Sequence, residues 1–200
     1  MPTLLYIHGF LSSPSSFKAK QVKEYCRKYH PDITYLCPQL PPYPDQCAQQ
    51  LEALINAADQ PVYLIGSSMG GFWATWLSER YACKAVLVNP AVDVISLMPK
   101  YVGVSLKNYH HDETYLLTRR HLDQLKTYVV EELKQKSHYW LIAQEGDETL
   151  DYRLAVEKYA GCKQTVEPGG DHGFQRFERF FDDMANFFNS KNIKKSSNKQ

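Results

Sequence analysis

The hydrophobic residues of this chain occur in short runs, separated by longer segments in which charged and apolar residues alternate. Runs that are typical of buried strands occupy residues 3–7, 33–36, 62–65, 85–88, 138–143 and 164–166. The intervening segments predict helices over residues 17–29, 45–58 and 152–159 and from residue 69 onward, with Asp45 as an N-cap. Strands that alternate with helices and are apolar throughout favour a mostly parallel sheet covered by helices on both faces, an α/β fold.

Apolar residues also recur at steps of three and four near the end of the chain, at Phe174, Phe177, Phe181, Met184 and Phe188. This spacing predicts one helix that docks on the sheet, rather than a face for a partner or a membrane. Residues 191–200 are rich in Lys, Ser and Asn and predict a disordered tail.

The segment 98–136 interrupts the alternation of strands and helices. It contains a Tyr- and His-rich stretch and then a pattern that predicts a helix over residues 118–134. An insertion after the strand at 85–88 would lie over the carboxyl ends of the strands, so we expect a small cap here. The rest of residues 1–190 is expected to form one domain with this insertion.

Composition narrows the possible partners. The formal net charge of the 200 residues is +1, which gives no electrostatic reason to expect a nucleic acid or an anionic membrane. The five cysteines are scattered without a C-x-x-C pair, as is typical of free thiols in a reducing compartment. No apolar stretch has the length of a membrane span. These features predict a cytoplasmic protein, and they leave its oligomeric state open.

The most informative motif is G-x-S-x-G, from Gly66 to Gly70, directly after the apolar run 62–65. In this motif a tight strand-to-helix turn exposes a nucleophilic serine, and glycines flank the serine because the turn has no room for Cβ atoms. If Ser67 were the nucleophile, the bulky Ile65 and Met69 would occupy the crowded positions. Ser68 is therefore the candidate nucleophile, and Ser67 is expected to pack beneath the turn.

A serine nucleophile requires a histidine to accept its proton and an acid to orient that histidine. In α/β-hydrolases the order along the chain is serine, acid, histidine. Asp147 follows the strand at 138–143, and His172 follows the strand at 164–166 and precedes the last helix. Of the seven histidines only His172 has this position, so Ser68, Asp147 and His172 form the predicted triad.

Other acidic residues remain as alternatives for the acid. Asp93 follows the preceding strand, where some hydrolases carry this residue. Asp151 could cap the next helix instead, and Glu145 and Glu148 are expected to be solvated.

An oxyanion hole would need two backbone N–H groups, one after the nucleophile and one in the loop after the first strand. By position these belong to Met69 and Phe10, and Gly9 lets the first loop turn its amides inward.

Taken together, these motifs resemble those of the YqiA-like small bacterial esterases, a family of the α/β-hydrolase superfamily. The resemblance extends from the first strand to about Phe188 and rests on His8-Gly9-Phe10, Gly66 to Gly71, Gly146-Asp147-Glu148, Leu150-Asp151-Tyr152 and Gly169 to His172. It implies a compact α/β-hydrolase fold and an esterase that needs no cofactor, with Ser68, Asp147 and His172 as its triad.

The resulting functional hypothesis is hydrolysis of a small carboxylic ester or thioester through an acyl-enzyme on Ser68. Met98, Tyr101 and Tyr109 are predicted to line the substrate pocket, although they could merely pack the cap. The cap is too short for a deep lipid tunnel, which favours short to medium acyl chains. The alternative class is a non-catalytic binding protein that keeps this fold.

A metal site at His110, His111, Asp112 and His121 is a further alternative. Adjacent histidines point in different directions, so we expect a solvated surface there and no metal.

Overall fold

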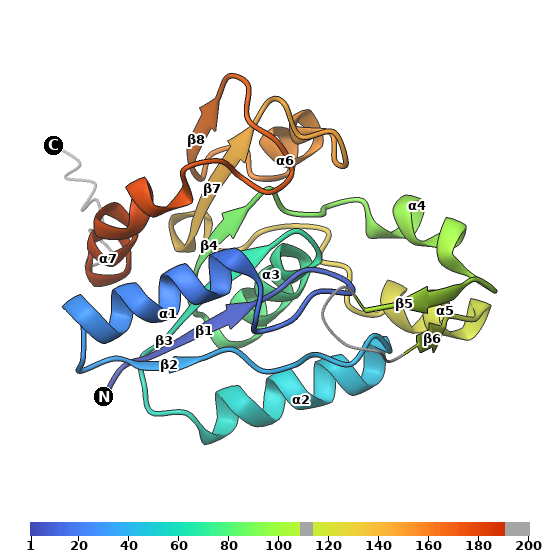
Figure 1. Ribbon diagram of the computed structural model, residues 1–200, viewed down its shortest axis with the longest axis horizontal. Coiled ribbons are helices and arrows are strands. Elements are labelled where there is room, and N and C mark those ends of the chain that lie inside the picture. The colour runs from blue at the N-terminus through green and yellow to red at the C-terminus, as the bar shows by residue number, and fades with distance from the viewer. Residues whose placement is uncertain (109–113, 191–200) are drawn as a thin grey trace, which may run out of the picture.

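The computed structural model describes residues 1–108 and 114–190. Six parallel strands form the central sheet in the order β2-β1-β3-β4-β7-β8 (Figure 1). The strands are β1 (Thr3–Ile7), β2 (Thr34–Leu36), β3 (Val62–Ser67), β4 (Lys84–Val88), β7 (Tyr139–Gln144) and β8 (Lys163–Glu167). The predicted α/β fold with a parallel sheet is confirmed.

Helices cover both faces of this sheet, because each strand directs alternate apolar side chains to opposite sides. On one face, Leu4 and Tyr6 of β1 pack with α1 (Phe17–Tyr29), the 3-10 helix η3 (Phe177–Phe180) and α7 (Phe181–Asn189). On the other face, Leu5 and Ile7 pack with α2 (Pro44–Ala57), α3 (Met69–Tyr81) and α6 (Tyr152–Lys158). Figure 1 shows α1 and α7 side by side, away from α2.

The sequence predicted that the C-terminal apolar stripe forms one helix, and this prediction is wrong. Phe174 and Arg176 have left-handed backbone conformations, with φ of 62° and 57°. The chain uses these conformations to leave the loop that contains His172, so the helical structure begins only at η3. All five residues of the stripe are buried, which confirms that it packs on the sheet.

The start of α2 also differs from the prediction. Its N-cap is Tyr43, and Asp45 lies in the first turn of the helix. Pro44 occupies the first helical position because its fixed φ and missing N–H suit that position. The carboxylate of Asp45 instead accepts hydrogen bonds from the Tyr128 hydroxyl, at 2.8 Å, and from the Gln124 side chain.

The insertion between β4 and β7 contains short elements only: α4 (Val94–Leu97), η1 (Met98–Tyr101), β5 (Ser105–Lys107), β6 (Thr114–Leu116), α5 (Arg119–Lys126) and η2 (Lys136–His138). We call residues 94–108 and 114–138 the cap. β5 and β6 form an antiparallel pair that the sequence did not predict. The helix predicted over 118–134 ends at Lys126, where Thr127, Val129 and Val130 bring β-branched side chains that disfavour helix.

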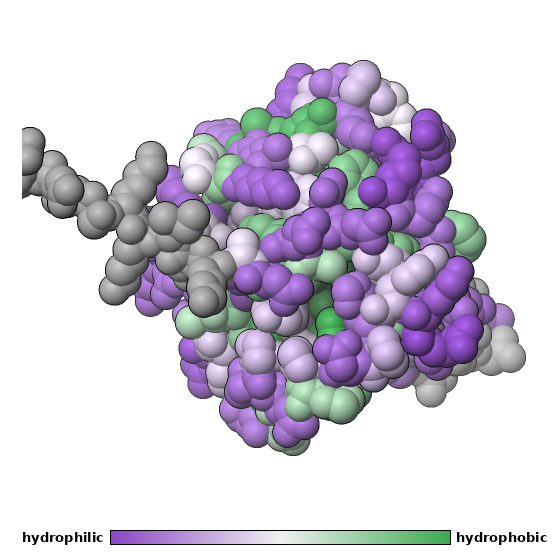
Figure 2. Space-filling view, turned by 90° about the vertical axis from the view of Figure 1, so that its left-hand side faces the viewer, coloured by the Kyte–Doolittle hydropathy of each residue, from purple (hydrophilic) through white to green (hydrophobic). Residues whose placement is uncertain are grey.

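The face of the molecule in Figure 2, which is the left-hand side of Figure 1, is covered mostly by hydrophilic residues, with small hydrophobic areas between them. Within residues 1–108 and 114–190, no helix combines the length and the apolar character that crossing a bilayer would require.

Candidate active site

Ser68 forms the turn between β3 and α3, with φ of 56° and ψ of −123°. A residue with a Cβ atom rarely adopts this conformation, and such strain gathers at functional sites. A Cβ atom at Gly66 would overlap the Gly70 carbonyl, and one at Gly70 would overlap the carbonyl oxygen of Ile7. The two glycines therefore allow α3 to approach β1 closely. Ser67 is buried at the end of β3, in agreement with the prediction.

A chain of hydrogen bonds connects the three predicted triad residues. Ser68 Oγ lies 3.1 Å from His172 Nε2. His172 Nδ1 lies 2.9 Å and 2.8 Å from the two carboxylate oxygens of Asp147. The His172 side chain is 24% exposed, whereas that of Asp147 is 2% exposed. With its proton on Nδ1, His172 can accept the Ser68 proton on Nε2 and remain fixed by a carboxylate beneath the surface.

The loop between β7 and α6 holds this carboxylate in place. The backbone N–H groups of Thr149 and Leu150 donate to Asp147 Oδ1 at 2.9 Å and 2.8 Å. Together with the imidazole, these donors satisfy a carboxylate that would otherwise be costly to bury. The loop thus presents Asp147 as a hydrogen-bond acceptor for the imidazole.

The alternative acids have other roles in the structure. Asp93 is exposed and caps α4 through a 3.2 Å hydrogen bond from the Ser96 N–H. Asp151 caps α6 through a 3.0 Å hydrogen bond from the Arg153 N–H, as expected for this residue. Glu148 is exposed but not merely solvated, because its carboxylate accepts the His172 backbone N–H at 3.0 Å. Hydrogen bonds from its own backbone N–H and from that of His172 lower the pKa of Glu148.

Two buried amides that the sequence analysis did not single out fix the loop that contains His172. Asn89, directly after β4, donates from Nδ2 to the carbonyls of Asp171, at 3.0 Å, and His172, at 3.3 Å. Its Oδ1 accepts the Gln144 backbone N–H at 2.9 Å. The Gln144 side chain accepts the N–H groups of Asp171, at 3.3 Å, and Gln175, at 2.8 Å. The sequence feature that could have pointed to them is a polar residue at the end of a buried strand, here β4 and β7.

The loop after β1 approaches the candidate nucleophile Ser68 closely, since a Cβ atom at Gly9 would lie 3.2 Å from Ser68 Cβ. Within the described part of the chain, no hydrogen bond uses the backbone N–H of Phe10 or of Met69. Both groups are thus available as donors beside Ser68, which an oxyanion hole requires.

Buried His8 stabilises this loop. Its Nε2 accepts the Leu40 N–H at 3.2 Å, so its proton is on Nδ1, which contacts the Gly9 carbonyl at 2.9 Å.

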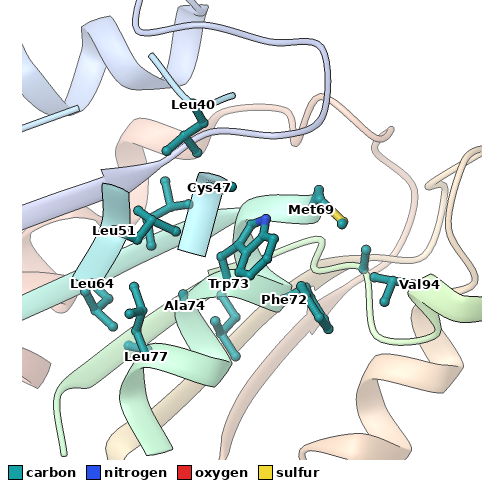
Figure 3. Close-up of a cluster of buried hydrophobic side chains, with 14 of the residues drawn as sticks. Leu40, Cys47, Leu51, Leu64, Met69, Phe72, Trp73, Ala74, Leu77 and Val94 are labelled. Carbon is teal, nitrogen blue, oxygen red and sulfur yellow. The ribbon is translucent and has the colours of Figure 1, made fainter. Parts of the chain in front are cut away.

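Two spaces meet at His8, Gly9 and Phe10, which line both. One is an open cleft of about 420 Å³ that contains Ser68 and His172. The other is a narrow cavity of about 40 Å³ under the cap, which has room for about three water molecules. The residues that line this cavity are mostly apolar and include Leu40, Cys47, Met69, Trp73 and Met98. Figure 3 shows the first four of these side chains within the buried cluster on the α2 and α3 face.

The structure places the predicted pocket residues of the cap separately. Met98 is buried and lines the narrow cavity under the cap. Tyr101 lines the open cleft, and its ring centroid lies 5.5 Å from that of Phe10. Tyr109 lies outside the described residues, as do His110, His111 and Asp112.

His121, the remaining residue of the considered metal site, belongs to a helix cap. Its Nδ1 accepts the Thr118 backbone N–H at 3.1 Å at the start of α5. Over residues 1–108 and 114–190, no group of three or more His, Cys, Asp or Glu side chains could hold a metal ion.

Comparison with known proteins identifies a family and a fold. The family model described as "Uncharacterised protein family (UPF0227)" matches residues 3–189.

Three solved structures with the same architecture are distant in sequence. The esterase Est1E from Butyrivibrio proteoclasticus with bound ferulic acid has a TM-score of 0.71 and 15% identity, over 95% of this chain and 90% of the other. A putative hydrolase from Agrobacterium vitis S4 has a TM-score of 0.73 and 17% identity, over 94% and 88%. A putative lipase from Acinetobacter baumannii AYE has a TM-score of 0.64 and 18% identity, over 93% and 83%. These similarities identify the α/β-hydrolase fold.

Proposed function

Because the chain belongs to the UPF0227 family and has the fold of known esterases and lipases, we propose that it is a serine esterase. The family match agrees with the resemblance to the YqiA-like proteins. The observation that carries the proposal is the continuous hydrogen-bond chain from Ser68 Oγ through His172 to Asp147. This arrangement matches what an activated serine requires, and it spans residues 104 positions apart in the sequence.

In the proposed mechanism, Ser68 Oγ attacks the acyl carbon while its proton passes to His172 Nε2. The resulting imidazolium is stabilised by the Asp147 carboxylate, 2.8 Å from Nδ1. The N–H groups of Phe10 and Met69 stabilise the tetrahedral oxyanion. His172 then protonates the leaving alcohol or thiol, and the acyl group remains on Ser68 until a water molecule, deprotonated by the same imidazole, hydrolyses it.

The two spaces beside the loop after β1 suggest where the two parts of the substrate bind. The narrow apolar cavity beside Met69 suits the acyl chain, and its volume of about 40 Å³ favours acyl groups of only a few carbons. The open cleft suits the alcohol or thiol part. Bound ferulic acid in the similar Est1E structure is consistent with a small organic ester as the substrate class.

The test is turnover of 4-nitrophenyl esters of graded acyl length by the wild type and by Ser68→Ala. We expect Ser68→Ala to lower kcat by about 10⁴-fold or more, because no other described nucleophile contacts His172. Highest kcat/KM is expected on acetyl and butyryl esters. Ser67→Ala is the matched control, since Ser67 lies buried beneath the turn, and it should keep most of the activity.

Turnover by Ser68→Ala at the parent rate would contradict the assignment of the nucleophile. A wild type that hydrolyses none of these esters and resists a serine-directed phosphonate would contradict the proposed function.

A further inference from the structure

A lysine lies in the same cleft as the candidate nucleophile. Lys18, in the first turn of α1, lines the open cleft together with Ser68 and His172 and is half-buried. Its Nζ donates to the Gly173 carbonyl at 2.7 Å. Gly173 directly follows His172, so the ammonium group is held one residue from the proposed general base.

The electrostatic character of the cleft follows from this residue. Apart from the histidines His8 and His172, Lys18 is the only side chain of a charged type among the described residues that line the cleft, and no carboxylate lines it. The other polar side chains at this end carry hydroxyl groups, such as Ser12, Ser16 and Thr149.

The ammonium group has donors to spare. An ammonium has three N–H donors, and the Gly173 carbonyl uses one. Lys18 forms no ion pair within the described part of the chain. An ammonium with unused donors in such a cleft is an effective recognition site for an oxyanion.

Building on the proposed esterase function, we propose that Lys18 selects esters whose alcohol part carries a negative charge, such as a carboxylate. The acyl group occupies the apolar cavity beside Met69, and the alcohol part lies in the open cleft, where the Lys18 ammonium binds its anionic group. Lys18 is thus a specificity-determining residue for the leaving group.

The charge on Lys18 depends on pH near the physiological range. Burial lowers the pKa of Lys18 to about 8, and the nearby carboxylates of Asp171 and Asp147 oppose this change only in part. The ammonium is therefore charged below about pH 8 and neutral above it. The other titratable side chains that line the cleft are Tyr6, His8, Tyr101 and His172. Preference for an anionic substrate should be present at pH 7 and fade as the pH rises through about 8.

The experiment compares three acetate esters that differ in the charge of the leaving group: 4-acetoxybenzoate (anionic), 4-acetoxybenzamide (neutral) and 4-acetoxyphenyl-trimethylammonium (cationic). Each kcat/KM is divided by the spontaneous hydrolysis rate of that ester, which removes intrinsic differences in reactivity. For the wild type at pH 7, we expect the anionic ester to be preferred over the neutral one by about tenfold. The cationic ester should be the poorest substrate.

The variants isolate the charge of Lys18. Lys18→Met should abolish the preference for the anionic ester, and Lys18→Arg should keep it. Lys20→Met is the matched control, because Lys20 is an exposed lysine of the same helix that does not line the cleft. It should leave all three rates unchanged.

Two kinetic outcomes would overturn the proposal. One is a wild type without charge preference; the other is an equal loss on all three esters in Lys18→Met, which would mean that Lys18 only holds the Gly173 carbonyl. A binding measurement separates this test from the esterase function itself. By calorimetry, Ser68→Ala should bind 4-acetoxybenzoate about tenfold more tightly than 4-acetoxybenzamide, and Ser68→Ala with Lys18→Met should not. Equal affinities in the single variant would also overturn the proposal, whether or not the wild type hydrolyses these esters.

Discussion

The loops at the carboxyl edge of the sheet and the cap are built in different ways. The loop of His172 is tied to β4 and β7 by the buried amides of Asn89 and Gln144, whose side chains are 3% exposed. The cap consists of elements of three to eight residues. It contacts the loop after β1 through side chains such as that of Asn108, which is buried and donates to the Ser12 carbonyl at 3.0 Å.

This difference suggests a division of labour. The proposed chemistry depends on strand ends whose positions are fixed by a parallel sheet, which is how α/β proteins commonly place a site. Substrate choice depends on an insertion and on the surface of the cleft, where changes disturb fewer buried hydrogen bonds. Substitutions in the first region should therefore affect kcat, and substitutions in the cap should mainly change which ester is preferred.

Among the substitutions that test this comparison, the largest effect is expected from Asp147→Asn. The amide would favour the wrong tautomer of His172, so kcat should fall by about 10³- to 10⁴-fold with little change in fold. Steady-state kinetics on 4-nitrophenyl acetate, with circular dichroism to verify folding, measures this. Asp93→Asn is the matched control, since Asp93 is an exposed helix cap. Loss of activity in Asp93→Asn but not in Asp147→Asn would reverse the assignment of the acid.

An intermediate effect is expected from Asn89→Ala, which removes three hydrogen bonds between β4, β7 and the His172 loop. It should lower kcat by about tenfold to a hundredfold at nearly constant KM, and lower the free energy of unfolding by about 1–3 kcal/mol. Urea denaturation and kinetics provide the two readouts. The exposed Asn186 of α7 is the control, and its change to Ala should alter neither. A rise in KM alone in Asn89→Ala would place Asn89 in substrate binding and weaken the contrast between the two regions.

The smallest effect on the chemical step is expected from Met98→Ala in the cap. Removing this buried side chain enlarges the cavity of about 40 Å³, so longer acyl chains should be accepted. The ratio of kcat/KM for hexanoate to that for acetate should rise by about tenfold, while kcat on acetate changes by only a few-fold. Val104→Ala, on the exposed surface of the cap, should leave the ratio unchanged. An unchanged ratio in Met98→Ala would mean that the acyl chain lies elsewhere.

Much of the sheet and the juxtaposition of the three candidate residues could be predicted from the sequence. Buried parallel strands appear as short apolar runs, and the residues after β3, β7 and β8 must meet because the carboxyl ends of parallel strands share one edge. The structure brings Ser68, Asp147 and His172 within hydrogen-bond distance in the order expected from the motifs. Whether they catalyse the proposed reaction is for the variants above to test.

The remaining features depend on contacts that a local pattern does not contain. Asn89 and Gln144 form hydrogen bonds to backbone groups that are far away along the chain. A polar residue at the end of a strand does not reveal which backbone groups it will bind. The early end of α5 and the pairing of β5 with β6 depend on a few residues, too few for a periodic signal. In the sequence, Lys18 is one of several charged residues in the helix predicted over 17–29. Only the packing of α1 against the loop that contains Gly173 brings its side chain into the cleft.

The strand order also determines when the site can form during folding. β1 lies between β2 and β3 and pairs Thr3 with Thr34 on one side and with Val62 on the other. Each neighbouring pair in the sheet is parallel, so closing it requires an intervening segment to cross over first, and folding of such long-range topologies is slow. Ser68 and His172 are 104 residues apart and meet only after β4, β7 and β8 have joined β3. A nascent or partly unfolded chain therefore has the serine but not its hydrogen bond to His172, and the proposed nucleophile can be activated only in the assembled sheet.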